Sequence, residues 1–91
     1  MVRSPVPRIP PQHPQARTTR LDVAAFLLVR GFEVTGVEFQ DGVATFSFED
    51  PDRKADAVMR EFYNGGQVSA SEYAAAQKRT RDLMWEAKRA S

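Results

Sequence analysis

The sequence predicts a small α+β domain in which a two-stranded antiparallel hairpin is covered on one face by three helices. Two observations predict this fold. Alternating apolar and polar residues flank Asp41-Gly42 on both sides, which is a strong signal for a β-hairpin. Three further stretches, one before the hairpin and two after it, combine apolar residues with helix start and stop signals. The expected order is helix, strand, strand, helix, helix.

Residues 1–17 are expected to form a flexible, basic arm ahead of a single domain that spans residues 18–91. Five of the six prolines fall within the first fourteen residues, where they remove amide donors and fix φ. The Pro7–Pro10 segment has a PxxP pattern, which either docks on an aromatic groove or arises by chance in a proline-rich stretch. The arm contains no acidic residue and three arginines: Arg3, Arg8 and Arg17.

The first helix is expected to begin after Thr18-Thr19, since a threonine can cap its amino terminus, and to end at Gly31. This helix is apolar nearly all round, so it must be buried on more than one side. Two explanations remain open. Either the last two helices enclose it, or one patch on it forms an oligomer interface, made of Val23, Phe26 and Leu27.

The hairpin can be paired residue by residue from its Asp41-Gly42 turn. Continuing that register to the far end places Thr35 opposite Phe48, gathers the aromatic side chains on one face and leaves polar side chains on the other. Two strands alone are marginally stable in water. We therefore expect the helices to cover the aromatic face, or another chain to extend the sheet.

The second helix is expected to start with Asp50 as its N-cap and Pro51 at its first position, and to end at Asn64-Gly65-Gly66. The carboxylates of Glu49, Asp50 and Asp52 resemble a divalent-cation site, but capping and the helix dipole select the same residues. No metal ligand is therefore assigned.

The last helix is expected to run from a capping box at Ser69–Glu72 to about Arg89. Its apolar stripe should face the core and consists of Tyr73, Ala76, Thr80, Leu83, Met84 and Ala87. Trp85 points about 150° away from that stripe, at 100° per residue. Its neighbours on the helix surface are four cations: Lys78, Arg81, Lys88 and Arg89.

Composition excludes several classes of function. The chain has no cysteine, and its one histidine, His13, lies among the prolines of the arm. Cysteine or histidine catalysis and thiolate zinc sites therefore have no candidates. We expect no enzyme activity, no cofactor and no small-molecule substrate. No apolar run approaches the length of a membrane span or a signal peptide, so we expect a cytoplasmic protein that does not enter a membrane.

Charge is distributed unevenly along the chain. The net charge is +1, but residues 1–20 carry +4, residues 21–64 carry −5 and residues 65–91 carry +2. An aromatic ring among four cations can stack on a base while the cations contact phosphates. Alternatively, Trp85 packs under the arm or against another subunit, and the cations only solvate the helix. Both interpretations remain open.

Several segments resemble a family of short phage and bacterial proteins built on a domain of unknown function, over residues 19–84. They are Thr19–Leu28 (TRLDVAAFLL), Gly31-Phe32, the Val37–Phe48 hairpin, Phe62–Gly65 and Val68–Leu83. The resemblance implies the domain boundaries and a mobile-element context. It implies no activity and no site residue.

Two functional hypotheses follow. The first is a non-enzymatic accessory protein that binds nucleic acid weakly through its basic ends, with contacts from Trp85, Lys78, Arg81, Lys88, Arg89, Arg3, Arg8 and Arg17. The second is an interaction or structural module without a nucleic-acid role, which forms an oligomer or binds a protein partner through the first helix and the exposed hairpin edge.

Overall fold

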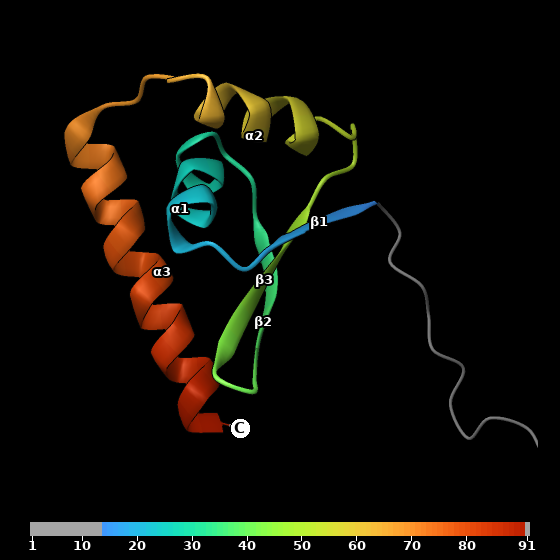
Figure 1. The fold of residues 1–91 in the computed structure, drawn as a ribbon, viewed down its shortest axis with the longest axis vertical. Coiled ribbons are helices and arrows are strands. Elements are labelled where there is room, and N and C mark those ends of the chain that lie inside the picture. Colours follow the sequence, from blue (N-terminus) through green and yellow to red (C-terminus); the bar gives the residue numbers. More distant parts are fainter. Residues whose placement is uncertain (1–13, 91) are drawn as a thin grey trace, which may run out of the picture.

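The computed structural model describes residues 14–90, which form three helices and a three-stranded antiparallel sheet (Figure 1). Their order is β1 (Gln15–Thr18), α1 (Leu21–Val29), β2 (Val34–Gln40), β3 (Val43–Glu49), α2 (Ala55–Tyr63) and α3 (Ala70–Ala90). α1 packs between the sheet and α3, and α2 lies across the end of α1. α3 continues on the same side of the sheet as far as the hairpin turn. The predicted α+β class is confirmed.

The predicted two-stranded sheet is wrong in one respect, because a third strand completes it. β1 pairs antiparallel with β3 along its whole length, which gives the strand order β1-β3-β2. The carbonyl oxygen of Pro14 accepts a further hydrogen bond from the amide of Asp50, at 2.8 Å. The predicted arm extends to residue 17, so the first three of the four residues of β1 fall within the segment that was expected to be flexible. Residues 1–13 of the arm, including Pro7–Pro10 and His13, lie outside the described residues.

The predicted register of the hairpin is confirmed from the turn as far as Gly36 opposite Ser47. Asp41 and Gly42 have φ values of 55° and 79°. Positive φ at both central residues is what a type I′ turn requires, and this turn matches the twist of the flanking strands. The apolar side chains on the helix-facing side of the hairpin include Val37, Phe39, Ala44, Phe46 and Phe48.

Beyond Gly36 the register shifts by one residue, so Val34 rather than Thr35 lies opposite Phe48. The predicted pair of Thr35 with Phe48 is therefore wrong. The shift gives the fully buried Phe48 an apolar partner and leaves Thr35 exposed. A bulge inserts one residue into one strand only. A strict alternation of apolar and polar residues therefore does not reveal it.

Gly31 and Gly65 follow the ends of α1 and α2 as predicted, with φ values of 92° and 84°. These left-handed conformations suit glycine at a helix C-terminus. The start of α1 differs from the prediction. Its N-cap residue is Arg20, and no side chain caps it. The Thr18 hydroxyl instead accepts a hydrogen bond from the Arg20 amide at 3.1 Å, ahead of the helix.

Asp50 is not the N-cap of α2, contrary to the prediction; the N-cap residue is Lys54, four residues later. A turn that includes Arg53, at φ 55°, separates the two, and α2 begins at Ala55 rather than at Pro51. The Asp50 carboxylate nevertheless reaches the helix, where it accepts hydrogen bonds from the amides of Lys54 (2.7 Å) and Ala55 (3.2 Å). Its oxygens therefore bind backbone donors at the start of the helix, although Asp50 does not occupy the N-cap position.

α1 forms the centre of the core. The Phe26 ring packs against Phe62 of α2, with 5.2 Å between ring centroids, and α3 and the sheet contact other sides of the helix. This arrangement matches the first explanation for the apolar surface of α1, enclosure within the chain. The three proposed interface residues, Val23, Phe26 and Leu27, are at most 1% exposed, so they have almost no surface to present to a second copy.

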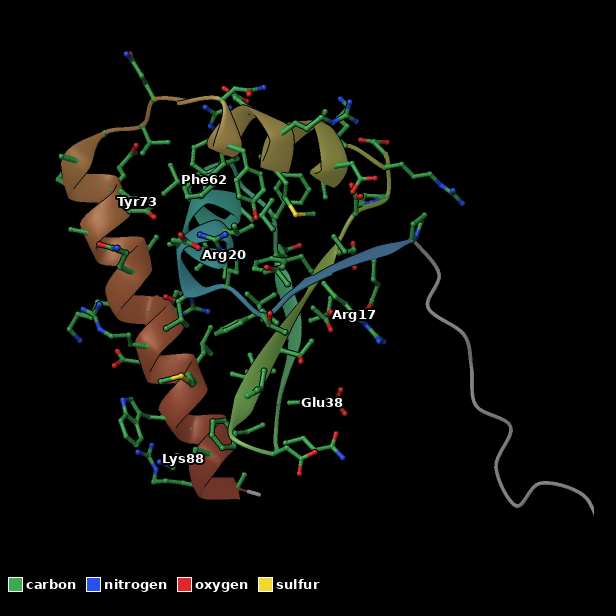
Figure 2. The ribbon with its side chains drawn as sticks, in the orientation of Figure 1. Arg17, Arg20, Glu38, Phe62, Tyr73 and Lys88 are labelled. Atoms are coloured by element: carbon green, nitrogen blue, oxygen red, sulfur yellow. The ribbon has the colours of Figure 1, made fainter. Side chains whose placement is uncertain are left out.

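The opposite face of the sheet carries no helix within residues 14–90 (Figure 1). Arg17 and Glu38 point out from this face (Figure 2). Thr45 and Ser47 of the central strand alternate with buried phenylalanines and are half-buried. The sheet thus has one apolar face against the helices and one polar face without them.

Candidate functional site

α3 is held in place by contacts at its first turns. Ser69 precedes it, and the Ser69 hydroxyl oxygen accepts a hydrogen bond from the Glu72 amide at 3.4 Å, in agreement with half of the predicted capping box. One turn later, the Tyr73 hydroxyl donates to the carbonyl oxygen of Asp22 on α1 at 3.2 Å. Ala76 and Thr80 are buried against the core. These contacts determine which side of α3 faces solvent.

Five predicted residues lie together on that solvent side, and we call them the α3 basic face: Lys78, Arg81, Trp85, Lys88 and Arg89. All five are exposed, and Trp85 retains 47% of its surface. At 100° per residue they occupy one side of the helix, away from Ala76 and Thr80. The structure therefore brings the five side chains together on one helix face.

Trp85 lies beside a cation and close to the hairpin. The Lys88 ammonium is 4.7 Å from the centroid of the Trp85 ring and 5.8 Å from the centroid of the Phe39 ring. Both distances are within the range of cation–π attraction. Phe39 is half-buried and packs against the core, so it anchors this end of α3 to β2. Sequence reasoning missed Phe39 as a neighbour of the face because the contact joins distant parts of the chain.

Acidic side chains border the α3 basic face. The Lys78 ammonium lies 3.3 Å from the Asp82 carboxylate one turn away. Both side chains are well exposed, so the pair is screened by solvent and contributes little to stability. Lys78 can therefore exchange this partner for another anion at small cost. Glu86 follows Trp85 directly in the sequence and is also exposed.

The three arginines of the arm do not join this face in the described structure. Arg17 is exposed on β1 and points out from the side of the sheet opposite to α3, whereas Lys88 lies on the α3 side (Figure 2). Arg3 and Arg8 lie outside the described residues. The basic ends that the sequence groups together are thus separated by the sheet where the structure describes them.

A second aromatic and cation pair lies where α1 and α2 meet. Arg20 donates hydrogen bonds of 3.1 and 2.8 Å to the two carboxylate oxygens of Asp22. Its guanidinium also lies 5.4 Å from the centroid of the Tyr63 ring, which is 58% exposed. Sequence reasoning missed this pair. The sequence feature that could have indicated this pair is Tyr63, an aromatic residue next to Asn64-Gly65 within one of the segments that resemble the family.

These contacts change the acidity of three groups. The hydrogen bond from Arg20, helped by the Val23 amide, lowers the pKa of Asp22 below its ordinary value, against the opposing effect of burial. The same hydrogen bond raises the pKa of Arg20. Burial, together with the charge of Asp22, raises the pKa of Tyr73. All three groups therefore stay in their ordinary ionisation states at neutral pH.

A family model for a domain of unknown function, DUF5659, matches residues 15–86. The chain belongs to the DUF5659 family. The match begins with the first residue of β1, so the DUF5659 domain includes the third strand. It ends at Glu86, so Lys78, Arg81 and Trp85 lie within the match and Lys88 and Arg89 beyond it.

Comparison of this DUF5659 protein with curated proteins and with solved structures gives no significant match. Within residues 14–90, no three acidic or histidine side chains are grouped closely enough to hold a metal ion. In the same range, no helix is both long enough and apolar enough to cross a bilayer.

Proposed function

We propose that this DUF5659 domain is an accessory protein that binds nucleic acid weakly through the α3 basic face. One observation carries the proposal: four cations and an exposed tryptophan share one solvent-facing side of a single helix. The cations can contact phosphates, and the indole ring offers a flat surface to a base.

The expected affinity is low for electrostatic reasons. The chain has a net charge of only +1, and Asp82 and Glu86 lie next to the cations. Arg17 faces the other side of the sheet, so the contact set proposed for the folded domain narrows to the α3 basic face. Arg3 and Arg8 remain candidates for additional phosphate contacts from the arm.

Trp85 allows a direct test because it is the only tryptophan. Oligonucleotides are titrated into the full chain at low and at high salt, and the tryptophan emission is recorded. Binding should quench or shift the tryptophan emission at low salt. High salt should weaken the binding steeply, because phosphate contacts release counterions. Arg81→Ala should weaken binding, whereas Arg60→Ala, which removes an exposed arginine of α2, should not. An emission that no oligonucleotide changes would contradict the proposal.

A second candidate function is an interaction module that self-associates or binds a protein. The α1 patch no longer supports it, since its residues are buried. The observation that favours it is β2, which forms one edge of the sheet and has a strand on one side only. Such an edge can pair with another chain. Light scattering that gives a monomer mass at micromolar concentration would count against self-association.

We further propose that the domain has no catalytic role, that it acts in the cytoplasm and that it derives from a phage or mobile element. The first statement is supported by composition, because residues 14–90 contain neither cysteine nor histidine. The other two rest on the sequence expectations described above. A hydrolase or transferase activity that survives in purified protein but is lost in a folded single-residue variant would refute the first.

A further inference from the structure

We infer that the α3 basic face selects single-stranded over double-stranded nucleic acid, and that Glu86 contributes to this selection. The inference rests on the proposed function and names the substrate class of the same site. It is carried by two features: the uneven charge on the two flanks of α3, and the exposure of one aromatic ring.

The two flanks of the exposed side of α3 differ in charge. Helical geometry places Arg81 and Lys88 on one flank, and Lys88 lies near Phe39 at the hairpin end. The other flank carries two carboxylates, Asp82 and Glu86, among three cations: Lys78, Arg79 and Arg89. A groove of about 310 Å³ runs along this second flank, and its charged lining residues are Lys78, Arg79, Asp82 and Glu86. A neighbouring groove of about 380 Å³ places Glu86 beside β2.

A duplex meets both flanks at once. A helix that enters the major groove, which is about 12 Å wide, has a phosphate backbone on each side. On α3, one backbone would lie along Arg81 and Lys88, and the other would lie along Asp82 and Glu86. The second contact is less favourable than the first, because the two carboxylates offset the cations beside them. A single strand has one backbone, which can follow the basic flank alone.

Trp85 favours the same substrate. The residue is 47% exposed although the Lys88 ammonium lies over its ring at 4.7 Å, so part of its surface remains open to a ligand. In a duplex the faces of the bases are already stacked on one another, whereas bases of a single strand can stack on a protein ring. Phe39 holds this end of the helix against the sheet, which keeps the ring in position.

The test compares a short labelled oligothymidine with a duplex of equal length, by fluorescence anisotropy of the full chain at low salt. The single strand should bind at least about fivefold more tightly, the lower end of the range for one base–aromatic stack. Trp85→Leu should remove most of this difference by weakening single-strand binding. Glu86→Gln should tighten duplex binding more than single-strand binding. Glu38→Gln makes the same change of charge on the opposite face of the sheet and should alter neither affinity.

The outcomes separate the inference from the proposed function. If duplex and single strand bind equally and Trp85→Leu changes neither, the face recognises phosphates alone; the inference is then wrong and the proposed function stands. If neither ligand binds at low salt, the proposed function itself is wrong. Circular dichroism of each variant shows that it is folded, so a loss of binding reports on the site.

Discussion

The Arg30 guanidinium, at the end of α1, donates hydrogen bonds of 2.7 and 2.6 Å to the two carboxylate oxygens of Glu61 on α2. It also donates to the carbonyl oxygen of Gln67 at 3.2 Å and lies 4.7 Å from the centroid of the Phe26 ring. A single side chain therefore connects α1, α2 and the segment that leads to α3.

Replacing Arg30 should destabilise the domain more than replacing an ordinary surface arginine. The pair with Glu61 is partly exposed, 30% and 43% for the two side chains, so solvent screening limits its contribution. The bidentate geometry and the contact with the Phe26 ring increase the contribution of Arg30 to stability. We expect Arg30→Ala to lower the free energy of unfolding by about 1–2 kcal/mol in urea titrations. Arg60→Ala on α2 is the control, and an equal loss there would contradict this account.

Gly66 should not tolerate a side chain, although its φ is not in the left-handed region. A Cβ atom would lie 2.8 Å from Cγ of Glu61, 2.9 Å from the Glu61 carbonyl oxygen and 3.1 Å from Cζ of Phe26. We expect Gly66→Ala to lower the free energy of unfolding by about 1–3 kcal/mol, the usual cost of overpacking. Gly36→Ala is the matched control, because its Cβ meets nothing within 4 Å. Similar unfolding curves for the two variants would disprove the steric argument.

Asp50 should stabilise the start of α2 through its side-chain oxygens. The carboxylate is 7% exposed and accepts from two backbone amides, one of them the amide of the buried Ala55. We expect Asp50→Ala to cost about 1–2 kcal/mol, the usual cost of losing a side chain that accepts from amides at a helix start, measured by chemical denaturation. Asp50→Asn keeps an acceptor oxygen and should cost less. If both variants lose the same amount, hydrogen bonding to the helix is not the cause.

Stability should fall in acid because of Asp22. Its folded pKa lies below its ordinary value of 3.8, chiefly through the hydrogen bond from Arg20. The unfolded chain therefore takes up the proton first as the pH falls. The stabilising contribution is complete above the ordinary pKa and is lost as the pH drops through the folded value.

Asp22→Asn isolates this contribution. The variant should be less stable than the wild type at neutral pH, and the difference in the free energy of unfolding should shrink when urea titrations are repeated below about pH 3.8. Glu38→Asn, on the polar face of the sheet, provides a comparison of the same charge change. A difference for Asp22→Asn that is constant from neutral pH to pH 3 would rule out the pairing with Arg20 as its source.

Local signals were sufficient for much of the fold. Asp41-Gly42 identifies the hairpin because a type I′ turn needs residues that accept positive φ, and Gly31 and Gly65 identify helix ends for the same reason. β1 could not be found in this way. Its residues, Gln15–Thr18, show no apolar alternation, and the strand exists only because β3 offers it an open edge.

For the candidate site, periodicity alone predicted which residues of α3 share its exposed face, since a helix of 21 residues has a fixed angular repeat. The distribution of charge between the two flanks follows from the same angular repeat. The neighbourhood of Phe39 was not predictable, because it depends on how α3 lies across the sheet. The side of the sheet on which Arg17 lies was not predictable either, because it is set by the pairing of β1 with β3.

The attachment of β1 to β3 also bears on how the domain folds and opens. β1 pairs with a strand that follows α1 and β2 in the chain, so closing this ladder requires a longer loop than closing the hairpin. We therefore expect β1 to dock after the hairpin has formed. In native-state fluctuations, β1 should detach before the hairpin opens. Amide hydrogens in the β1–β3 ladder should then exchange with solvent sooner than those between β2 and β3, and each opening would expose the edge of the central strand, β3.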